Sequence, residues 1–265
     1  LAPRAKRKVQ ARPRAHGDGL HIHLDSPEAF EEVLWKMYWP EKYRGNLIAL
    51  WRAADQQSVA NRFIQRHMQK ISAARATVDC DTPRYCSKNN ANIARLSYLG
   101  EAFPDCRVVI ALRQPRSHAA SLLRQHHNFR VKQAEDEFVR RYMRDIGHFE
   151  FGLLHQPVAF AGFDHQRYDA LTPDYWLAYW IGAFGEVAAH RDRCLIVTQD
   201  ALRAEPGRTM HALCEALALA PGDATFEHFF HPQPDAPPSE HFDPALLREA
   251  DELYATLAAD ALGSS

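Results

Sequence analysis

The sequence predicts an α/β protein, a three-layer α/β/α domain with a parallel central sheet. Two short apolar runs, Arg107–Leu112 and Cys194–Thr198, are typical of buried strands, and a helical pattern follows each of them. Strands that alternate with helices form parallel sheets. The chain has 265 residues, of which 46% are hydrophobic and 25% charged, as in folded proteins. This length suits one large domain or two small ones, and we expect one.

The region 25–79 is predicted to be helical and follows a basic lead-in over residues 1–24. One helix is expected over Asp25–Trp39, with Ser26 as N-cap and Pro27 at the first helical position. A second helix is expected over Asp55–Ala74. Apolar residues at three-and-four spacing are expected to face the core in both: Phe30, Val33, Leu34, Met37, Val59, Phe63, Ile64 and Met68.

An α/β core is predicted over residues 80–220. Arg84–Ser87 is a short strand candidate, and Asn89 or Asn90 can cap the helix that follows to about Phe103. Arg107–Leu112 is a strand that we expect to be covered on both faces, and a new helix starts near Ser117. The order is strand–helix–strand–helix, which places the strand-to-helix loops at one edge of the sheet.

The remaining elements follow from the same patterns. A charged helix is predicted over Gln133–Leu154 with Phe138, Tyr142 and Ile146 inward, and residues 157–163 form a strand or a buried loop. Further helices are expected over Asp174–Ala189, whose aromatic stripe we interpret as core, and over Pro206–Leu219. Residues 221–265 comprise a Pro-rich linker and a last helix, capped by Asp243 and ending at Gly263.

Composition excludes several classes of protein. The formal charge of −1 argues against a wholly basic nucleic-acid binder. The longest apolar runs are far shorter than the roughly 20 residues of a membrane span, so we expect none. The five cysteines form no CxxC pair, which favours reduced, mostly buried thiols and a cytoplasmic, bacterial setting. The histidines His126, His127, His148 and His155 lack the spacing of metal ligands, so no metal is expected.

Three residues at the predicted loop edge are suited to bind a phosphate or sulfate group. Arg113 leaves a strand, and Ser121 lies eight residues later in the first turns of the next helix. A guanidinium, a hydroxyl and the unpaired amides of a helix start together bind a doubly charged oxyanion. Lys88 is expected on the same rim, where an ammonium offsets charge on a transferring phosphoryl or sulfuryl group. Without the others, Arg113 and Ser121 are equally consistent with a capping arginine and a packed serine, and Lys88 is better explained as an ordinary solvated lysine.

These residues resemble the core of sulfotransferases that use 3′-phosphoadenylyl sulfate (PAPS), most closely the bacterial and tyrosylprotein-type branch. The resemblance spans residues 80–220 and is carried by Tyr85–Asn90, Arg95, Leu99, Phe103–Asp105, Arg107–Pro115, Ala119–Leu123, Leu195–Leu202, Glu205, Pro206 and Leu213–Leu217. It implies a fold related to P-loop kinases. It also implies that Arg113 and Ser121 bind the donor's 3′-phosphate, and that Lys88, with Asn89 beside it, lies near the sulfate and the acceptor.

The chain departs from this family before Lys88. The glycine-containing loop that holds the donor's 5′-phosphosulfate is not found, and the chain starts at Leu1. We therefore expect that the first βα unit lies upstream and is missing here. A base must take the proton of the acceptor. His16, Asp18 and Glu31 are the candidates by position, although the segment around His16 and Asp18 is equally consistent with a polar turn.

The predicted function is transfer of a sulfuryl group from PAPS to a hydroxyl or amine acceptor, without a metal. A kinase of the same fold is one alternative, but it requires a Gly-Lys-Ser/Thr loop and a magnesium-binding acid, which the sequence lacks. A second alternative is a non-catalytic nucleotide-binding or interaction module that has lost its donor loop. The acceptor itself cannot be read from the residues.

Overall fold

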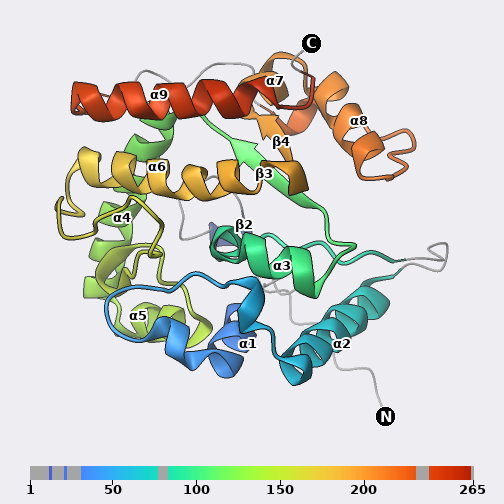
Figure 1. Cartoon of the computed structure of the whole chain (residues 1–265), viewed down its shortest axis with the longest axis horizontal. Helices are drawn as coiled ribbons and strands as arrows, with labels where there is room; N and C mark the ends of the chain where they lie inside the picture. The colour runs from blue at the N-terminus through green and yellow to red at the C-terminus, as the bar shows by residue number, and fades with distance from the viewer. Residues whose placement is uncertain (1–11, 14–20, 23–30, 77–82, 231–238, 264–265) are drawn as a thin grey trace.

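The computed structural model describes residues 12–13, 21–22, 31–76, 83–230 and 239–263 and is dominated by helices (Figure 1). The helices are α1 (Glu31–Tyr38), α2 (Ser58–Arg75), α3 (Leu96–Ala102), α4 (Pro115–Glu135), α5 (Glu137–Ile146), α6 (Pro173–Ala189), α7 (Gln199–Ala204), α8 (Pro206–Ala216) and α9 (Pro244–Ala259). The strands are β1 (Arg12–Pro13), β2 (His21–Ile22), β3 (Val108–Leu112) and β4 (Cys194–Thr198). A six-residue 3-10 helix, η3 (Asn90–Arg95), leads directly into α3.

The two strands predicted from apolar runs pair with each other in parallel. Their register runs from Val108 opposite Cys194 to Leu112 opposite Thr198. Both strands therefore end at the same edge of the sheet, where the Gln114 amide donates a hydrogen bond of 3.0 Å to Asp200. Within the described residues this parallel sheet has two strands, and β1 and β2 form a separate antiparallel pair. The α/β class is confirmed, whereas the three layers remain a prediction.

The strand expected at Arg84–Ser87 is wrong. These residues pair with no strand in the part of the chain that the structure describes. Their polar groups bond elsewhere: the hydroxyls of Tyr85 and Ser87 donate to Glu31, and Arg84 donates to the carbonyl of Leu217. Lys88 consequently follows an irregular segment instead of a strand.

The larger hydrophobic core lies between the two-stranded sheet and helices α4, α6 and α9 (Figure 1). The aromatic stripe of α6 fills it as predicted, since Trp176, Trp180 and Phe184 are all buried. Helix α9 begins as predicted, with Asp243 accepting hydrogen bonds from the amides of Ala245 and Leu246. This core fixes the start of α4 beside the carboxyl end of β3.

A second core joins α1, α2 and α3 around Trp35, Trp39, Trp51 and Tyr98. Of the apolar residues predicted to face inward here, Ile64 is buried, and Leu34 and Met68 pack against this core. Four others are exposed, contrary to the prediction: Val33, Met37, Val59 and Phe63. On α1, Glu31, Glu32 and Trp35 are buried in place of Val33 and Met37. Phe30, Ser26 and Pro27 lie outside the described residues.

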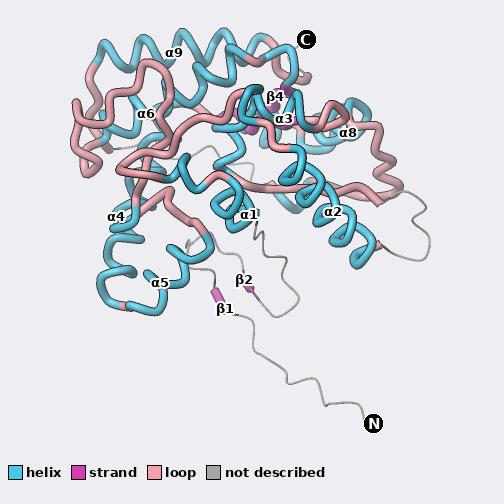
Figure 2. Tube along the Cα trace, turned by 60° about the horizontal axis from the view of Figure 1, so that its bottom comes forward, coloured by secondary structure: helices cyan, strands magenta, loops and turns pink. Residues whose placement is uncertain are grey.

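Three further expectations are corrected. Strand β3 is not covered on both faces, because Val109 is 40% exposed. The helix predicted over Gln133–Leu154 is interrupted at Asp136, whose carboxylate caps the separate helix α5, and Figure 2 shows the change of direction between α4 and α5. Phe138 and Tyr142 are exposed on α5, and Met143 is its buried residue.

Residues 157–163 form a buried loop, one of the two alternatives that the sequence allowed. Val158 and Phe160 are buried, and a single parallel bridge joins Val158 to Ile48. Main-chain hydrogen bonds from Ile48 to Pro157 and from Ala159 to Ile48 complete the attachment, both 2.9 Å long. The loop therefore closes one wall of a cavity between the two cores.

Candidate functional site

An open cavity of about 250 Å³ lies where the two cores meet. Most of its lining comes from residues 90–93 after Lys88, helix α4, the segment 147–160 and helix α6, and Glu32 of α1 and Ile48 complete it. Most of the lining is aromatic or aliphatic. Its polar residues are Glu32, Asn90, His118, Glu150 and Gln156.

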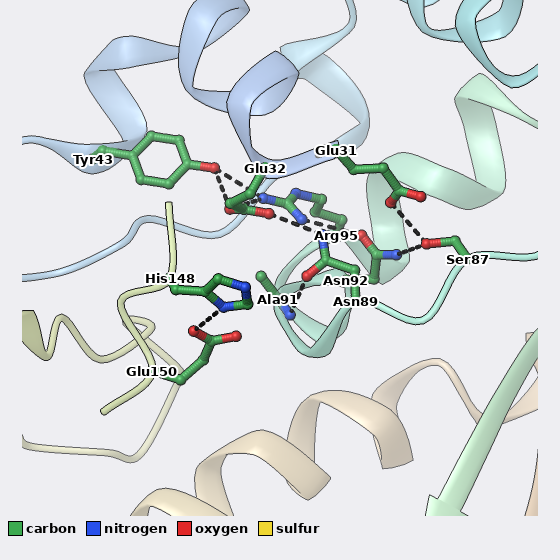
Figure 3. Close-up of polar contacts among 10 residues, drawn as sticks. All are labelled: Glu31, Glu32, Tyr43, Ser87, Asn89, Ala91, Asn92, Arg95, His148 and Glu150. Carbon is green, nitrogen blue, oxygen red and sulfur yellow. Dashed lines mark hydrogen bonds and ion pairs between the residues drawn. The ribbon is translucent and has the colours of Figure 1, made fainter. Parts of the chain in front are cut away.

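The chain on both sides of Lys88 is held by two neighbouring carboxylates of α1 (Figure 3). Before Lys88, Glu31 accepts hydrogen bonds from Tyr85 and, at 2.7 Å, from Ser87. After Lys88, Glu32 accepts a 2.9 Å hydrogen bond from the side-chain amide of Asn89. Glu31 and Glu32 are both buried, so these bonds are shielded from water and fix the loop.

Asn89 also starts the helix that follows. Its side-chain oxygen accepts a 3.0 Å hydrogen bond from the amide of Ala91, which confirms the predicted cap. Asn89 thus bonds to η3 through its oxygen and to Glu32 through its nitrogen. Lys88, the residue before it, is exposed.

The anchor of this arrangement is Arg95, which is fully buried. Its guanidinium forms a 2.6 Å ion pair with Glu32 and donates a 2.9 Å hydrogen bond to the hydroxyl of Tyr43. It lies between the rings of Trp35 and Trp51, 4.4 and 4.3 Å from their centroids. A buried carboxylate needs such a partner, and Arg95 provides it for Glu32.

Glu150 faces the Lys88 loop from the opposite wall of the cavity. Its carboxylate lies 3.2 Å from Nδ1 of His148, and its side chain is 28% exposed. Burial acts to raise the pKa of Glu150, but His148 and Lys88 oppose it and the net pKa is lowered. Glu150 is therefore ionised at neutral pH and lies within electrostatic reach of Lys88.

Arg113 and Ser121 lie beside another wall. Arg113 is half-buried directly after β3, and Ser121 is half-buried in the second turn of α4, next to the cavity-lining Leu122. Burial, and then the charge of Arg113, lowers the pKa of the cavity-lining His118 to about 4. Arg113 thus lies near His118, as Lys88 lies near Glu150. Lys88, Arg113 and Ser121 themselves do not line the cavity, but the residues near or next to them, Glu150, His118 and Leu122, do.

Of the three predicted bases, the structure describes Glu31. His16 and Asp18 lie outside the described residues. Glu31 is buried and accepts hydrogen bonds from two hydroxyl groups, so it holds the loop in place. Glu31 therefore fixes the residues before Lys88 through its hydrogen bonds with Tyr85 and Ser87.

The described part of the chain also bears on metal binding, membrane insertion and the state of the cysteines. In that part, no group of three or more metal-ligating side chains is present, and no helix is long and apolar enough to cross a membrane. Four of the five cysteines are described and all four are free thiols; Cys86 and Cys106 are exposed, which corrects the expectation of mostly buried thiols.

Sequence reasoning missed Glu32, Arg95 and Glu150 as site residues. One signal was present: Arg95 interrupts the apolar stripe of Ile93, Leu96 and Leu99, and a charge at such a position needs a buried partner. Glu150 offered no signal, because the helix predicted across it does not exist.

Comparison with known proteins identifies the family. Curated proteins and solved structures include no significant match to the chain. The family model described as "Sulfotransferase family" matches residues 13–223, which include the whole Lys88 loop, β3, α4 and β4. The chain belongs to the sulfotransferase family.

Proposed function

We propose that this protein transfers a sulfuryl group from PAPS to a hydroxyl or amine acceptor. The observation that supports the proposal is the family match over residues 13–223, which include a cavity whose lining residues Glu150 and His118 lie near Lys88 and Arg113, respectively. In the reaction, the acceptor atom bonds to sulfur while the bond from sulfur to the bridging oxygen of the donor breaks. The electron pair of that bond stays with the phosphate.

Arg113 and Ser121 bind the donor's 3′-phosphate in this proposal. Arg113 contributes a planar fork of charged donors, and Ser121 contributes a hydroxyl from the second turn of α4. The first amides of α4 have no partner within the helix and add a partial positive charge. This donor set fits a dianionic phosphate without a metal ion.

Lys88 and Asn89 act at the transferring group. Negative charge accumulates on the leaving phosphate oxygen as its bond to sulfur breaks, and an ammonium placed there lowers the barrier. Such a charge is effective only when it is positioned in advance. The hydrogen bonds that Tyr85 and Ser87 donate to Glu31, and Asn89 to Glu32, supply that positioning.

The acceptor must also lose a proton to a base. His16 and Asp18 are the sequence-based candidates. Their replacement by Ala and Asn, respectively, is expected to lower kcat by about 100-fold or more if either takes the proton. Donor binding would be unchanged, because neither residue belongs to the phosphate-binding set.

Replacement of Arg113 by Ala tests the donor site. We expect the affinity for adenosine 3′,5′-bisphosphate, measured by calorimetry, to fall by about 10- to 100-fold, the value of a charged hydrogen bond of roughly 1.5–3 kcal/mol. Arg66→Ala is the matched control, since Arg66 is an exposed arginine of α2 remote from the cavity. Equal affinity in Arg113→Ala and wild type would remove Arg113 from the donor site.

A transfer assay separates the enzyme from a binding module. With ³⁵S-labelled PAPS and a mixture of alcohols and amines, the enzyme is expected to release labelled product in proportion to protein concentration. Binding of the bisphosphate without any transfer would instead favour a non-catalytic nucleotide-binding module.

A further inference from the structure

We infer that the cavity binds the acceptor, and that this acceptor is a ring-bearing alcohol of about two rings whose hydroxyl proton passes to Glu150. The inference rests on the proposed sulfuryl transfer and adds to it the substrate class and the base. Neither follows from membership of the family, because the lining of the cavity is a property of this chain.

The lining favours an apolar ring system. Seven aromatic side chains of α6 and of the segment 147–160 line it, among them Phe149, Phe160, Trp176 and Trp180. Rings stack favourably against such walls, whereas each sugar hydroxyl would lose its hydrogen bonds to water. The lining therefore selects against carbohydrate acceptors.

The volume sets the size of the acceptor. An apolar cavity of about 150 Å³ holds one benzene ring. The cavity here measures about 250 Å³. It consequently has room for about two rings, and it is open to solvent.

Glu150 is the polar group suited to the hydroxyl. Glu32 is already paired with Arg95 and Asn89, and Nδ1 of His118 accepts a 3.2 Å hydrogen bond from Trp180. The contact of Glu150 with His148 uses one of its two oxygens, and a carboxylate has about four acceptor sites. Glu150 can therefore accept the hydrogen bond of an acceptor hydroxyl.

The position of Glu150 matches the direction of transfer. Glu150 lines the cavity and lies within electrostatic reach of Lys88, so in this proposal a hydroxyl bound to Glu150 points toward the sulfuryl group that Lys88 contacts. The hydroxyl oxygen bonds to sulfur, its proton moves to Glu150, and the sulfur–oxygen bond to the donor phosphate breaks with its electron pair on the phosphate. Atoms and charge balance without a further reactant.

Binding of 2-naphthol to the whole chain tests the cavity without activity. Trp176 and Trp180 line the cavity, so bound naphthol is expected to quench tryptophan fluorescence. Ala183→Leu places a larger side chain on the cavity wall and is expected to weaken this binding at least 10-fold. Ala189→Leu, at the exposed end of the same helix, is the matched control and is expected to bind as wild type does.

Kinetics with labelled PAPS test the role of Glu150. Glu150→Gln is expected to lower kcat for 2-naphthol by at least 100-fold and to change the dissociation constant of naphthol by less than threefold. Glu252→Gln, an exposed glutamate of α9, is expected to leave both values unchanged. Wild-type affinity for adenosine 3′,5′-bisphosphate in each variant shows that the chain is folded.

The outcomes separate this inference from the proposed function. Binding of the bisphosphate and transfer to a monosaccharide, with neither quenching nor sulfation of 2-naphthol, overturn the inference and leave sulfuryl transfer standing. Loss of kcat in His16→Ala or Asp18→Asn with full kcat in Glu150→Gln overturns the assignment of the base. No binding of the bisphosphate and no transfer to any acceptor overturn the proposed function, and this inference with it.

Discussion

Arg95 shows how one buried side chain determines the conformation of a functional loop. Its ion pair with Glu32 orients the carboxylate that also holds Asn89, the residue after Lys88. The guanidinium and Glu32 are almost wholly removed from solvent. Loss of one member of such a pair leaves the other charge buried and unpaired, which costs more than the pair itself contributes.

We therefore predict that Arg95→Ala lowers the free energy of unfolding by about 3–5 kcal/mol, the cost of leaving Glu32 without its partner. The measurement is urea denaturation followed by tryptophan fluorescence. Arg66→Ala, which removes an exposed arginine, is expected to change stability by no more than about 0.5 kcal/mol. Similar stabilities for the two variants would show that Glu32 finds another partner.

At the scale of elements, the segment that carries Glu150 is attached to helix α4 by buried hydrogen bonds. Gln133 accepts from the amides of Leu153 and Leu154, at 2.6 and 3.3 Å, and His126 accepts from the amide of Gly152 at 3.2 Å. Gly152 has a φ of +81°, and a β-carbon there would lie 2.4 Å from the oxygen of Gln133. The close approach of α4 therefore requires glycine at this position.

Gly152→Ala and Gly162→Ala form a matched pair for this attachment. Both positions have positive φ, so both variants are expected to lose about 1–2 kcal/mol of stability. Only Gly152→Ala also forces Gln133 aside, which is expected to cost about 1–3 kcal/mol more. Thermal or urea unfolding measures the difference. Equal losses of stability in the two variants would mean that moving Gln133 away from residue 152 costs no free energy.

At the scale of the whole molecule, three histidines link stability to pH, one of them buried and two half-buried. His118, His126 and His155 lie where α4, the segment 147–155 and α6 pack together, and each has a pKa lowered to about 4. Burial is the main cause in all three. Arg113 adds to it at His118, and His155 adds to it at His126. These side chains are neutral in the folded protein at pH 7.

The sign of the pH effect follows from these shifts. An unfolded histidine has a pKa near 6.5. Between pH 6.5 and 4 the unfolded chain therefore binds protons at these histidines, whereas the folded chain does not. The stabilisation is complete above pH 6.5 and is lost as the pH falls from 6.5 toward 4. Each histidine contributes up to about 1.4 kcal/mol per pH unit in this window.

His126→Asn is expected to remove about one third of the histidine contribution to the change of the unfolding free energy with pH. The measurement is the free energy of unfolding by urea at several pH values between 4 and 7, in the variant and in wild type. A variant curve parallel to that of wild type would contradict the prediction, because it would mean that His126 binds its proton equally in both states.

Local signals in the sequence predicted much of the fold. Apolar β-branched runs predicted β3 and β4, and Asp243 followed by Pro244 predicted the start of α9, because a strand or a cap depends on neighbouring residues. The failures occurred where long-range contacts compete. Val59 and Phe63 have helical spacing yet are exposed, and Tyr85 bonds to Glu31 instead of joining a sheet.

The sequence by itself determined the family core, the two parallel strands, and the places of Arg113 directly after β3 and of Ser121 in α4, since these depend on motifs within short stretches of chain. Only the tertiary structure decided what surrounds them. Glu32 and Arg95 are 63 residues apart along the chain, and Glu150 comes from a third segment. Such partners meet because the two cores pack against each other, and spacing along the sequence carries no information about that packing.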